Sequence, residues 1–347
     1  MTSATSPQDR LYSRRFQTLA LSVTFIAAAL ALTQPNAGPS DILGIAQGYG
    51  LGVTVLVIMW LLVQLIWVLL YGMTTEKSIA TPNTTPFYRL HFANTRWGDI
   101  AVALFALITT ISCFSVFKAV AVGDSGYGFD ELFIAWDRAI FGGSDPWMLT
   151  HSLLGSAFAT KVIDFLYHPA FLPMVLGYIA CIAMQGKPAL RYTYMASYLV
   201  GFLVIGMLIA NALHSAGPAY DGMLFGDGTT YAPLRERLAT HNAEAGPFAA
   251  VFAQQYLLDL HQTNGIGFGG GISAMPSMHI VLAALWMFAG WHINRILGMI
   301  LTIYTAIIWL GSVHLGWHYF VDGLIALLVL AVIWYAAGRY FGLYQKV

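Results

Sequence analysis

Long apolar runs separated by short polar segments dominate the chain. Each run is about as long as the roughly 20 residues that an α-helix needs to cross the hydrocarbon core of a bilayer. We expect about eight transmembrane helices, near residues 16–34, 44–72, 98–122, 157–184, 192–214, 276–293, 296–313 and 318–340. The pattern therefore predicts an all-α polytopic membrane protein.

The polar segments divide these runs into two groups. The first two runs form an N-terminal region, residues 1–97, and the other six form a domain over residues 98–347 that the long polar loop 215–275 interrupts. The first run follows three arginines, as a signal peptide would, but it is long for one and we expect a retained helix. The amphipathic segment 129–147 is expected to lie at the membrane surface.

Composition supports the membrane environment and excludes one class of partner. Hydrophobic residues make up 58% of the chain and charged residues 9%. The formal net charge is zero, so there is no basic excess of the kind that nucleic-acid binding needs. Cys113 and Cys181 both lie in apolar runs, where we expect them to pack as small hydrophobic side chains. No obligatory protein partner is evident.

Basic residues are distributed unequally between the two sides of the predicted bundle. If the N-terminus is cytoplasmic, the same side receives Lys77, Arg89, Arg96, Lys187, Arg191, Arg295, Arg339 and Lys346. Cytoplasmic loops carry an excess of Lys and Arg, so both termini are expected inside. The 215–275 loop and the helix starts near residues 276 and 318 then face outward, across what we expect to be a bacterial inner membrane.

Two polar clusters occur at those outward helix starts. SAMPSMH places His279 at the first, and GSVHLGWHYFVDGL places His314, His318 and Asp322 four residues apart at the second. On one helix face, His318 and Asp322 are within contact range. Ionisable side chains at a membrane edge are read as functional by default. Because both clusters lie at the same depth, they can converge on one pocket.

Two kinds of chemistry fit two histidines and a carboxylate. In the first, one histidine attacks phosphorus, the aspartate orients its ring and the second histidine protonates the leaving oxygen. In the second, these side chains bind zinc or iron. The first is favoured, because Ser277 at a helix N-terminus suits an anion, and no second histidine box is found.

These residues give the chain a specific resemblance. It resembles the type 2 phosphatidic acid phosphatase superfamily, whose second and third signature motifs stand here as Pro276-Ser277-Met278-His279 and Gly316 through Asp322. The resemblance implies a six-helix core, with His318 as nucleophile, Asp322 as its orienting group and His279 as the acid. It also implies that the reaction needs no metal or other cofactor.

The departures from the family pattern point to a branch. Hydrolytic members carry an arginine six residues before the third-motif histidine, where this chain has Ser312, and the segment NALHSAGPAYDG lacks the first-motif lysine and arginine. A cation-poor site suits a phosphodiester better than a phosphomonoester, which carries nearly two negative charges. The HYFVD string is similar to the inositol phosphorylceramide synthases. That resemblance implies a glycerophospholipid donor, such as phosphatidylinositol, and a lipid alcohol acceptor, such as ceramide.

Two other functions stay open. A lipid phosphate phosphatase acting on phosphatidic acid or a polyprenyl diphosphate is the nearer alternative, and Ser312 disfavours it. A non-catalytic lipid binder or transporter is the second, since intramembrane histidines and acids also mark transport pathways. The intact His279, His318 and Asp322 favour an enzyme.

Several further side chains are candidates for substrate contacts. The substrate-binding set that we expect is Ser277, Tyr220, His214 and Lys161. Lys118 and Lys161 both lie toward outward helix ends, where they can replace missing phosphate cations or snorkel to lipid headgroups, the second being favoured. We interpret His168, beside Pro169, as a hydrogen-bonded histidine at a helix kink. The glycine-rich run 265–271 is either a flexible linker or a close approach of backbone to the lipid.

Overall fold

The computed structural model describes residues 7–74, 97–122, 126–171, 178, 187–267 and 269–345. Within these ranges the fold is helical and contains no strand, which confirms the all-α polytopic class. Six helical stretches are long and apolar enough to cross a membrane: α1 (Pro7–Leu32), the first part of α2 (Pro39–Thr74), α4 (Trp97–Phe117) with its π-helical end η1 (Lys118–Val122), α9 (Pro188–Gly201) with η3 (Phe202–Ile209) and α10 (Ala210–Ala212), α14 (Arg295–His314), and α15 (Phe320–Tyr340). The protein is therefore an integral membrane protein.

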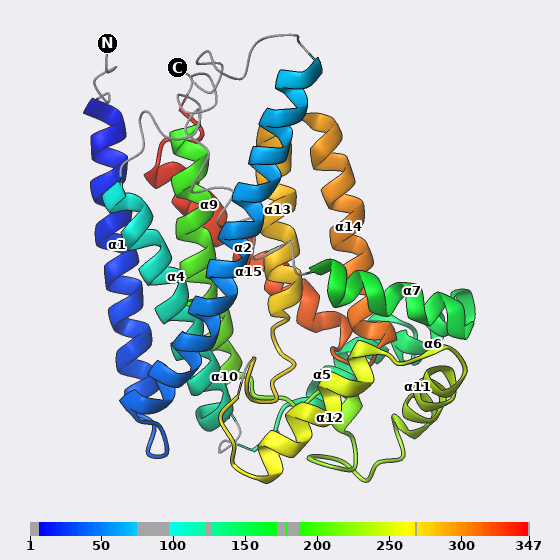
Figure 1. Cartoon of the computed structure of the whole chain (residues 1–347). Coiled ribbons are helices and arrows are strands. Elements are labelled where there is room, and N and C mark those ends of the chain that lie inside the picture. The colour runs from blue at the N-terminus through cyan, green and yellow to red at the C-terminus, as the bar shows by residue number, and fades with distance from the viewer. Residues whose placement is uncertain are drawn as a thin grey trace.

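A shorter apolar helix and a set of transverse helices complete the bundle. The shorter helix, α13 (Met278–Ile293), packs mainly against α14. The transverse helices α5 (Asp130–Ile140), α6 (Pro146–Leu153), α7 (Ala157–Tyr167), α11 (Ala232–Ala245) and α12 (Ala249–Gln262) gather at the end of the bundle away from the chain termini (Figure 1). The last two belong to the 215–275 loop. This loop is thus a helical cover and not an open connection.

The expected membrane span over residues 157–184 differs from the observed helix. Helix α7 ends at Tyr167 and lies across the bundle, and a 3₁₀ turn, η2 (Pro169–Phe171), follows it. Pro169 lacks the N–H that would continue the helix, which accounts for the end of α7 at Tyr167. Apart from Tyr178, the rest of the expected span lies outside the described residues.

The first helix is an integral part of the bundle. α1 packs against α4 and α9. At this junction the carboxylate of Asp99 accepts hydrogen bonds from Ser13 Oγ at 2.5 Å, Gln17 Nε2 at 2.6 Å and the Tyr192 hydroxyl at 2.6 Å. A buried carboxylate with three donors joins the three helices, because breaking any of these bonds would leave a polar group unsatisfied in an apolar surrounding.

Close helix contacts depend on small residues. A Cβ added to Gly290 of α13 would lie 2.7 Å from Leu301 Cδ1 of α14, and one added to Gly298 would lie 2.5 Å from Trp291 Cδ2. A Cβ on Gly323 of α15 would lie 2.5 Å from Trp309 Nε1. Membrane helices associate through such small residues because lipid supplies no hydrophobic driving force between them.

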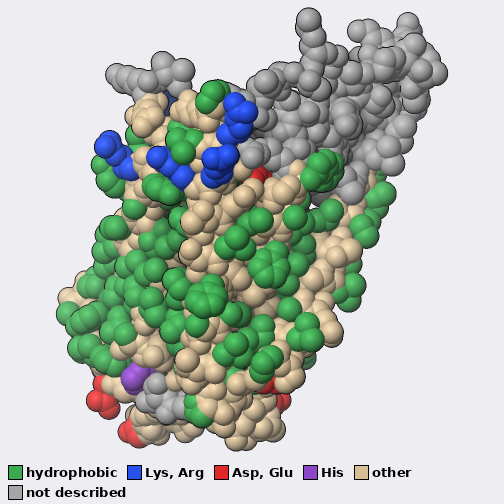
Figure 2. Space-filling view, turned by 90° about the vertical axis from the view of Figure 1, so that its left-hand side faces the viewer, with side chains coloured by type: hydrophobic (Ala, Val, Ile, Leu, Met, Phe, Trp, Pro, Cys, Tyr) green, Lys and Arg blue, Asp and Glu red, His purple; other side chains and the backbone are tan. Residues whose placement is uncertain are grey.

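Charged side chains mark the two ends of the bundle. Both termini lie at one end (Figure 1), and Lys and Arg side chains cluster there in Figure 2. The exposed basic residues at the helix ends in this region are Arg10, Arg14, Lys187, Arg295 and Arg339. The first residues of α13 and α15, which carry the two histidine motifs, lie nearer the opposite end.

Candidate active site

A cavity of about 470 Å³ lies between α2, α4, α9 with η3, α13 and the cover. Its wall is largely apolar, with Leu107, Ile111, Phe114 and Phe202 on one side and Leu282 on another. At one end it becomes polar, and the polar side chains there include Lys118, His168, His279 and His318. The cavity therefore joins an apolar chamber to a site with titratable groups.

His318 and Asp322 form the dyad that their spacing predicts. His318 Nδ1 lies 3.1 Å from Asp322 Oδ2, and the same oxygen accepts the N–H of Tyr319 at 3.1 Å. With the proton on Nδ1, the Nε2 atom of His318 keeps the lone pair that a nucleophile needs, and the backbone carbonyl of Ala274 also lies within hydrogen-bonding reach of the ring. Burial lowers the pKa of His318 to about 3, so the ring is neutral at neutral pH.

The turn before α15 is fixed by backbone bonds. The carbonyl of Ser312 accepts the N–H groups of Trp317 at 2.9 Å and His318 at 3.2 Å. Gly316 adopts a φ of 74°, which a residue with a side chain rarely takes, and its carbonyl accepts the N–H of Ala219 at 2.9 Å. The motif glycine is thus required by the turn that presents His318.

Two carboxylates of the transverse helix α5 hold this motif in place. Asp137 accepts the N–H groups of Phe320 at 2.8 Å and Val321 at 3.0 Å, which are free donors at the start of α15. Asp130 accepts the Tyr319 hydroxyl at 2.7 Å and also the backbone N–H of Gly217 at 2.8 Å. The expectation that segment 129–147 only lies at the membrane surface therefore misses its role in anchoring the site.

Among the described residues, no ion pair joins the neighbouring side chains Asp137 and Arg138. Arg138 instead binds Asp145 through Nε at 2.7 Å and Nη2 at 3.0 Å. Neighbouring residues on a helix point in different directions, so Asp137 faces the bundle while Arg138 faces the α5–α6 turn.

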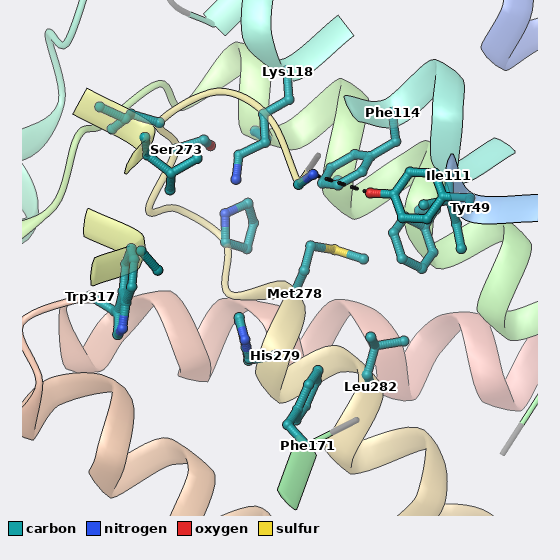
Figure 3. Close-up of a pocket in the computed structure, with 18 of the residues that line it drawn as sticks. Tyr49, Ile111, Phe114, Lys118, Phe171, Ser273, Met278, His279, Leu282 and Trp317 are labelled. Carbon is teal, nitrogen blue, oxygen red and sulfur yellow. Dashed lines mark hydrogen bonds between the residues drawn. The ribbon is translucent and has the colours of Figure 1, made fainter. Parts of the chain in front are cut away.

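His279 lies at the start of α13 and faces the same cavity. Its ring stacks on Tyr167 with centroids 4.5 Å apart, and Phe171 lies at 4.5 Å on a tilted plane. Figure 3 shows His279 with Phe171 beside it and Met278 and Trp317 around the same space. The structure thus brings His279 and His318 to one cavity, although about forty residues separate them in the chain.

The four substrate-binding candidates fall in different places. Tyr220 lines the cavity, and its hydroxyl donates to the carbonyl of Gln254 at 3.3 Å. Ser277 is fully buried at the N-cap of α13, and its hydroxyl has no hydrogen-bond partner among the described residues. His214 packs edge-to-face on Phe129 outside the cavity lining.

Lys161, the fourth candidate, is exposed on α7 and does not line the cavity. Lys118, for which snorkelling was favoured, does line it. A helix-end position alone could not distinguish the two lysines.

His314 points away from the dyad, contrary to the expected common face. Its ring stacks on His151 with centroids 3.8 Å apart and planes 2° apart, and Thr160 Oγ1 bridges His314 Nε2 and His241 Nδ1 at 3.0 Å each. α14 ends at His314, and the turn that follows rotates His318 toward the cavity. Across the described chain, no group of three or more His, Cys, Asp or Glu side chains is arranged to hold a metal ion.

His168 lines the cavity, although its place beside Pro169 predicts a hydrogen-bonded histidine at a helix kink. Its Nδ1 lies 3.0 Å from Asp164 Oδ1, and its Nε2 has no partner among the described residues. Asp164 also accepts the N–H groups of Ala249 at 2.8 Å and Ala250 at 2.8 Å, at the start of α12. The four-residue spacing of Asp164 and His168 is a sequence signal for this second His–Asp pair, but that the pair faces the cavity depends on how α7 crosses the bundle.

The glycine-rich run packs against the end of α4. A Cβ on Gly270 would lie 3.3 Å from the Ser115 carbonyl oxygen, and a Cβ on Gly271, whose φ is 79°, would clash with the carbonyl oxygen of Lys118. The N–H of Gly269 donates to the Tyr49 hydroxyl at 3.3 Å. These glycines permit a close backbone approach to the cavity wall, and the run is more than a linker.

Comparison with known proteins adds one match. A family model described as the PAP2 superfamily matches residues 131–336, which is more than half of the chain. The matched segment contains His168, His279 and the His318–Asp322 dyad, whereas α1, α2 and α4 precede it. No curated protein and no solved structure matches the chain.

Proposed function

Because the chain belongs to the PAP2 superfamily, whose members are phosphatases or phosphotransferases acting on lipid phosphates, we propose that it is a lipid phosphotransferase. It moves a phospho-headgroup from a glycerophospholipid, such as phosphatidylinositol, to a lipid alcohol, such as ceramide. The reaction proceeds through a phosphohistidine. The observation that carries this proposal is the oriented His318–Asp322 dyad facing the same cavity as His279, at the polar end of an apolar chamber.

The proposed reaction has two steps. His318 Nε2 attacks the donor phosphorus, the bond to the diacylglycerol oxygen breaks, and His279 gives that oxygen its proton. Asp322 stabilises the positive charge that the His318 ring acquires. In the second step the acceptor hydroxyl gives its proton to His279 and attacks phosphorus, and the N–P bond to His318 breaks.

The charge of the cavity favours a diester donor. Among the described residues that line it, Lys118 is the only Lys or Arg. Ser312 is buried, donates its hydroxyl to the Trp309 carbonyl at 2.7 Å and does not line the cavity. One fixed cation matches the single negative charge of a phosphodiester better than the nearly two charges of a phosphomonoester.

We propose that the termini are cytoplasmic and that the cavity opens toward the opposite face of a bacterial inner membrane. The gathering of Lys and Arg at the end that carries the termini supports this orientation. We further assign catalysis to residues 98–347, although α2 also contributes Tyr49 and Val53 to the cavity wall. Labelling of single cysteines introduced at the two ends with a membrane-impermeant reagent tests the orientation.

The test of function uses the purified full chain in lipid nanodiscs. Phosphatidylinositol labelled on phosphorus is the donor, supplied with and without ceramide, and His318→Ala is compared with the wild type. His292→Ala is the matched control, because His292 is exposed near the opposite end of α13. We expect label to move to a new lipid only with ceramide present, and His318→Ala to lose transfer altogether.

Donor alone provides a second readout. A covalent intermediate releases about one diacylglycerol per active site in a burst before any acceptor is added. Transfer without that burst would exclude the phosphohistidine step. Release of free phosphate from phosphatidic acid, without transfer, would make the protein a phosphatase. No reaction with any lipid phosphate would favour a non-catalytic lipid binder.

A further inference from the structure

We propose that Lys118, on a helix outside the family match, is the residue that binds the phosphate of the lipid donor. The proposal rests on the proposed phosphate chemistry at His318 and names the cation of that site. Lys118 is the first residue of η1, the π-helical end of α4, and the family model begins only at residue 131. The ligand class is a phosphate ester anion, with a phosphodiester preferred.

Lys118 has no counter-charge among the described residues. No Asp or Glu is found among the described residues that line the cavity, and no ion pair to Lys118 is present in the described chain. Its Nζ lies over the ring of Phe114, 5.8 Å from the centroid, a neutral partner that leaves the positive charge without a counter-ion. A lysine facing an apolar membrane cavity is strongly disfavoured unless an anion accompanies it. The described residues supply no such anion, so a ligand is needed.

The side chain of Lys118 points into the cavity and not toward the membrane surface. Figure 3 shows Lys118 extending from α4 into the cavity, with His279 on the facing wall. A lysine that snorkels directs its amine to the headgroup region, whereas Lys118 directs it toward the catalytic histidines. A phosphate placed for attack by His318 therefore lies within the space that Lys118 faces.

The backbone of Lys118 is closely packed. A Cβ on Gly271 would clash with its carbonyl oxygen, so the glycine-rich run lies directly against this turn. Tyr49 of α2 joins the same region, because its hydroxyl lies 2.9 Å from Ser115 Oγ and accepts the Gly269 N–H. Single π-helical turns within α-helices are frequent at functional sites. The first helices of the chain and the glycine-rich run thus position the cation.

The test substitutes Lys118 with methionine, which has similar length and no charge. The matched control is Lys187→Met, since Lys187 is exposed at the opposite end and donates to the carbonyl of His292 at 3.0 Å. We expect Lys118→Met to lower kcat/KM for the labelled phosphodiester donor by about 10- to 100-fold, mainly through KM. Lys118→Arg should keep a large part of the activity, and Lys187→Met should keep all of it.

Stability separates a binding role from a structural one. Removing an unpaired charge from an apolar cavity should leave the thermal unfolding midpoint of Lys118→Met unchanged or raise it. Orthovanadate, a phosphate analogue without acyl chains, is the probe for the anion site itself. It should raise the unfolding midpoint of the wild type and of Lys187→Met, but not that of Lys118→Met.

The outcomes distinguish the two proposals. If the wild type is active and Lys118→Met retains its kcat/KM, the assignment of Lys118 is wrong and the proposed function stands. If the wild type acts on no lipid phosphate, the proposed function fails, and the vanadate shift alone decides Lys118. A vanadate shift that survives in Lys118→Met, or a less stable folded variant with normal KM, overturns the inference.

Discussion

Gly323 controls the distance between the two catalytic helices. It follows Asp322 directly on α15 and faces Ile280 of α13, the residue after His279. A Cβ at this position would lie 2.5 Å from Trp309 Nε1 and would contact Ile280 Cδ1 even more closely. Gly323→Ala therefore places a methyl group where α13, α14 and α15 meet. On α15 this methyl group is next to Asp322, and on α13 it meets Ile280, the neighbour of His279.

The size of the disturbance follows from the contact distances. Carbon atoms pack at about 3.5–4.0 Å, so α15 has to move by about 1 Å. The indole of Trp309 has little freedom to yield, because its Nε1 donates to the Phe320 carbonyl at 3.0 Å. Overpacking of this kind is expected to lower the free energy of unfolding by about 1–3 kcal/mol. A misplacement of about 1 Å between reacting groups can lower the rate about 100-fold.

The assay compares kcat for the labelled donor with the thermal unfolding midpoint. Gly290→Ala is the control, because its Cβ would lie 2.7 Å from Leu301 Cδ1 at the far end of α13, so it also overpacks the bundle. We expect both variants to be destabilised, but only Gly323→Ala to lose about 100-fold in kcat. Unchanged kcat in a folded Gly323→Ala, or equal losses in both variants, would refute the reasoning.

Two further predictions concern acid stability and the lipid chamber. Burial lowers the pKa of His151 to about 4 in the folded protein, below its usual value of 6.5, so the unfolded chain takes up a proton first as the pH falls. Stability is therefore full above about pH 6.5 and falls toward pH 4, by up to about 3 kcal/mol from this residue. His151→Gln should show a smaller drop in unfolding midpoint between pH 7 and pH 5, and an equal drop would contradict the assignment. Gly52 of α2 lines the cavity and has open space at its Cβ. Gly52→Trp should fill part of the chamber and expose about two methylenes of the donor's acyl chain, which raises KM about tenfold. A short-chain analogue that does not reach this part of the chamber should keep its KM. Equal KM changes for both donors would show that the acyl chain lies elsewhere.

Local spacing was sufficient to predict the dyad. His318 and Asp322 are four residues apart at a helix start, so the first turn of α15 brings them into contact whatever the rest of the bundle does. The placement of His279 in the same cavity agrees with the expected common membrane depth of the two motifs. Their catalytic roles remain predictions that the proposed experiments test.

Contacts between side chains that only helix crossings bring together could not be predicted from local sequence patterns. His314 has the same four-residue spacing as the dyad, yet α14 ends there and its ring turns to His151. His168 and Lys118 face the cavity because of how α7 and α4 approach it, which no local pattern encodes. The sequence by itself determined the membrane class, most of the membrane-spanning helices and the His318–Asp322 pair, since each follows from hydropathy or from contacts within one turn. Only the tertiary structure decided which distant polar groups share the cavity, because that choice depends on helix directions set by packing across the whole bundle.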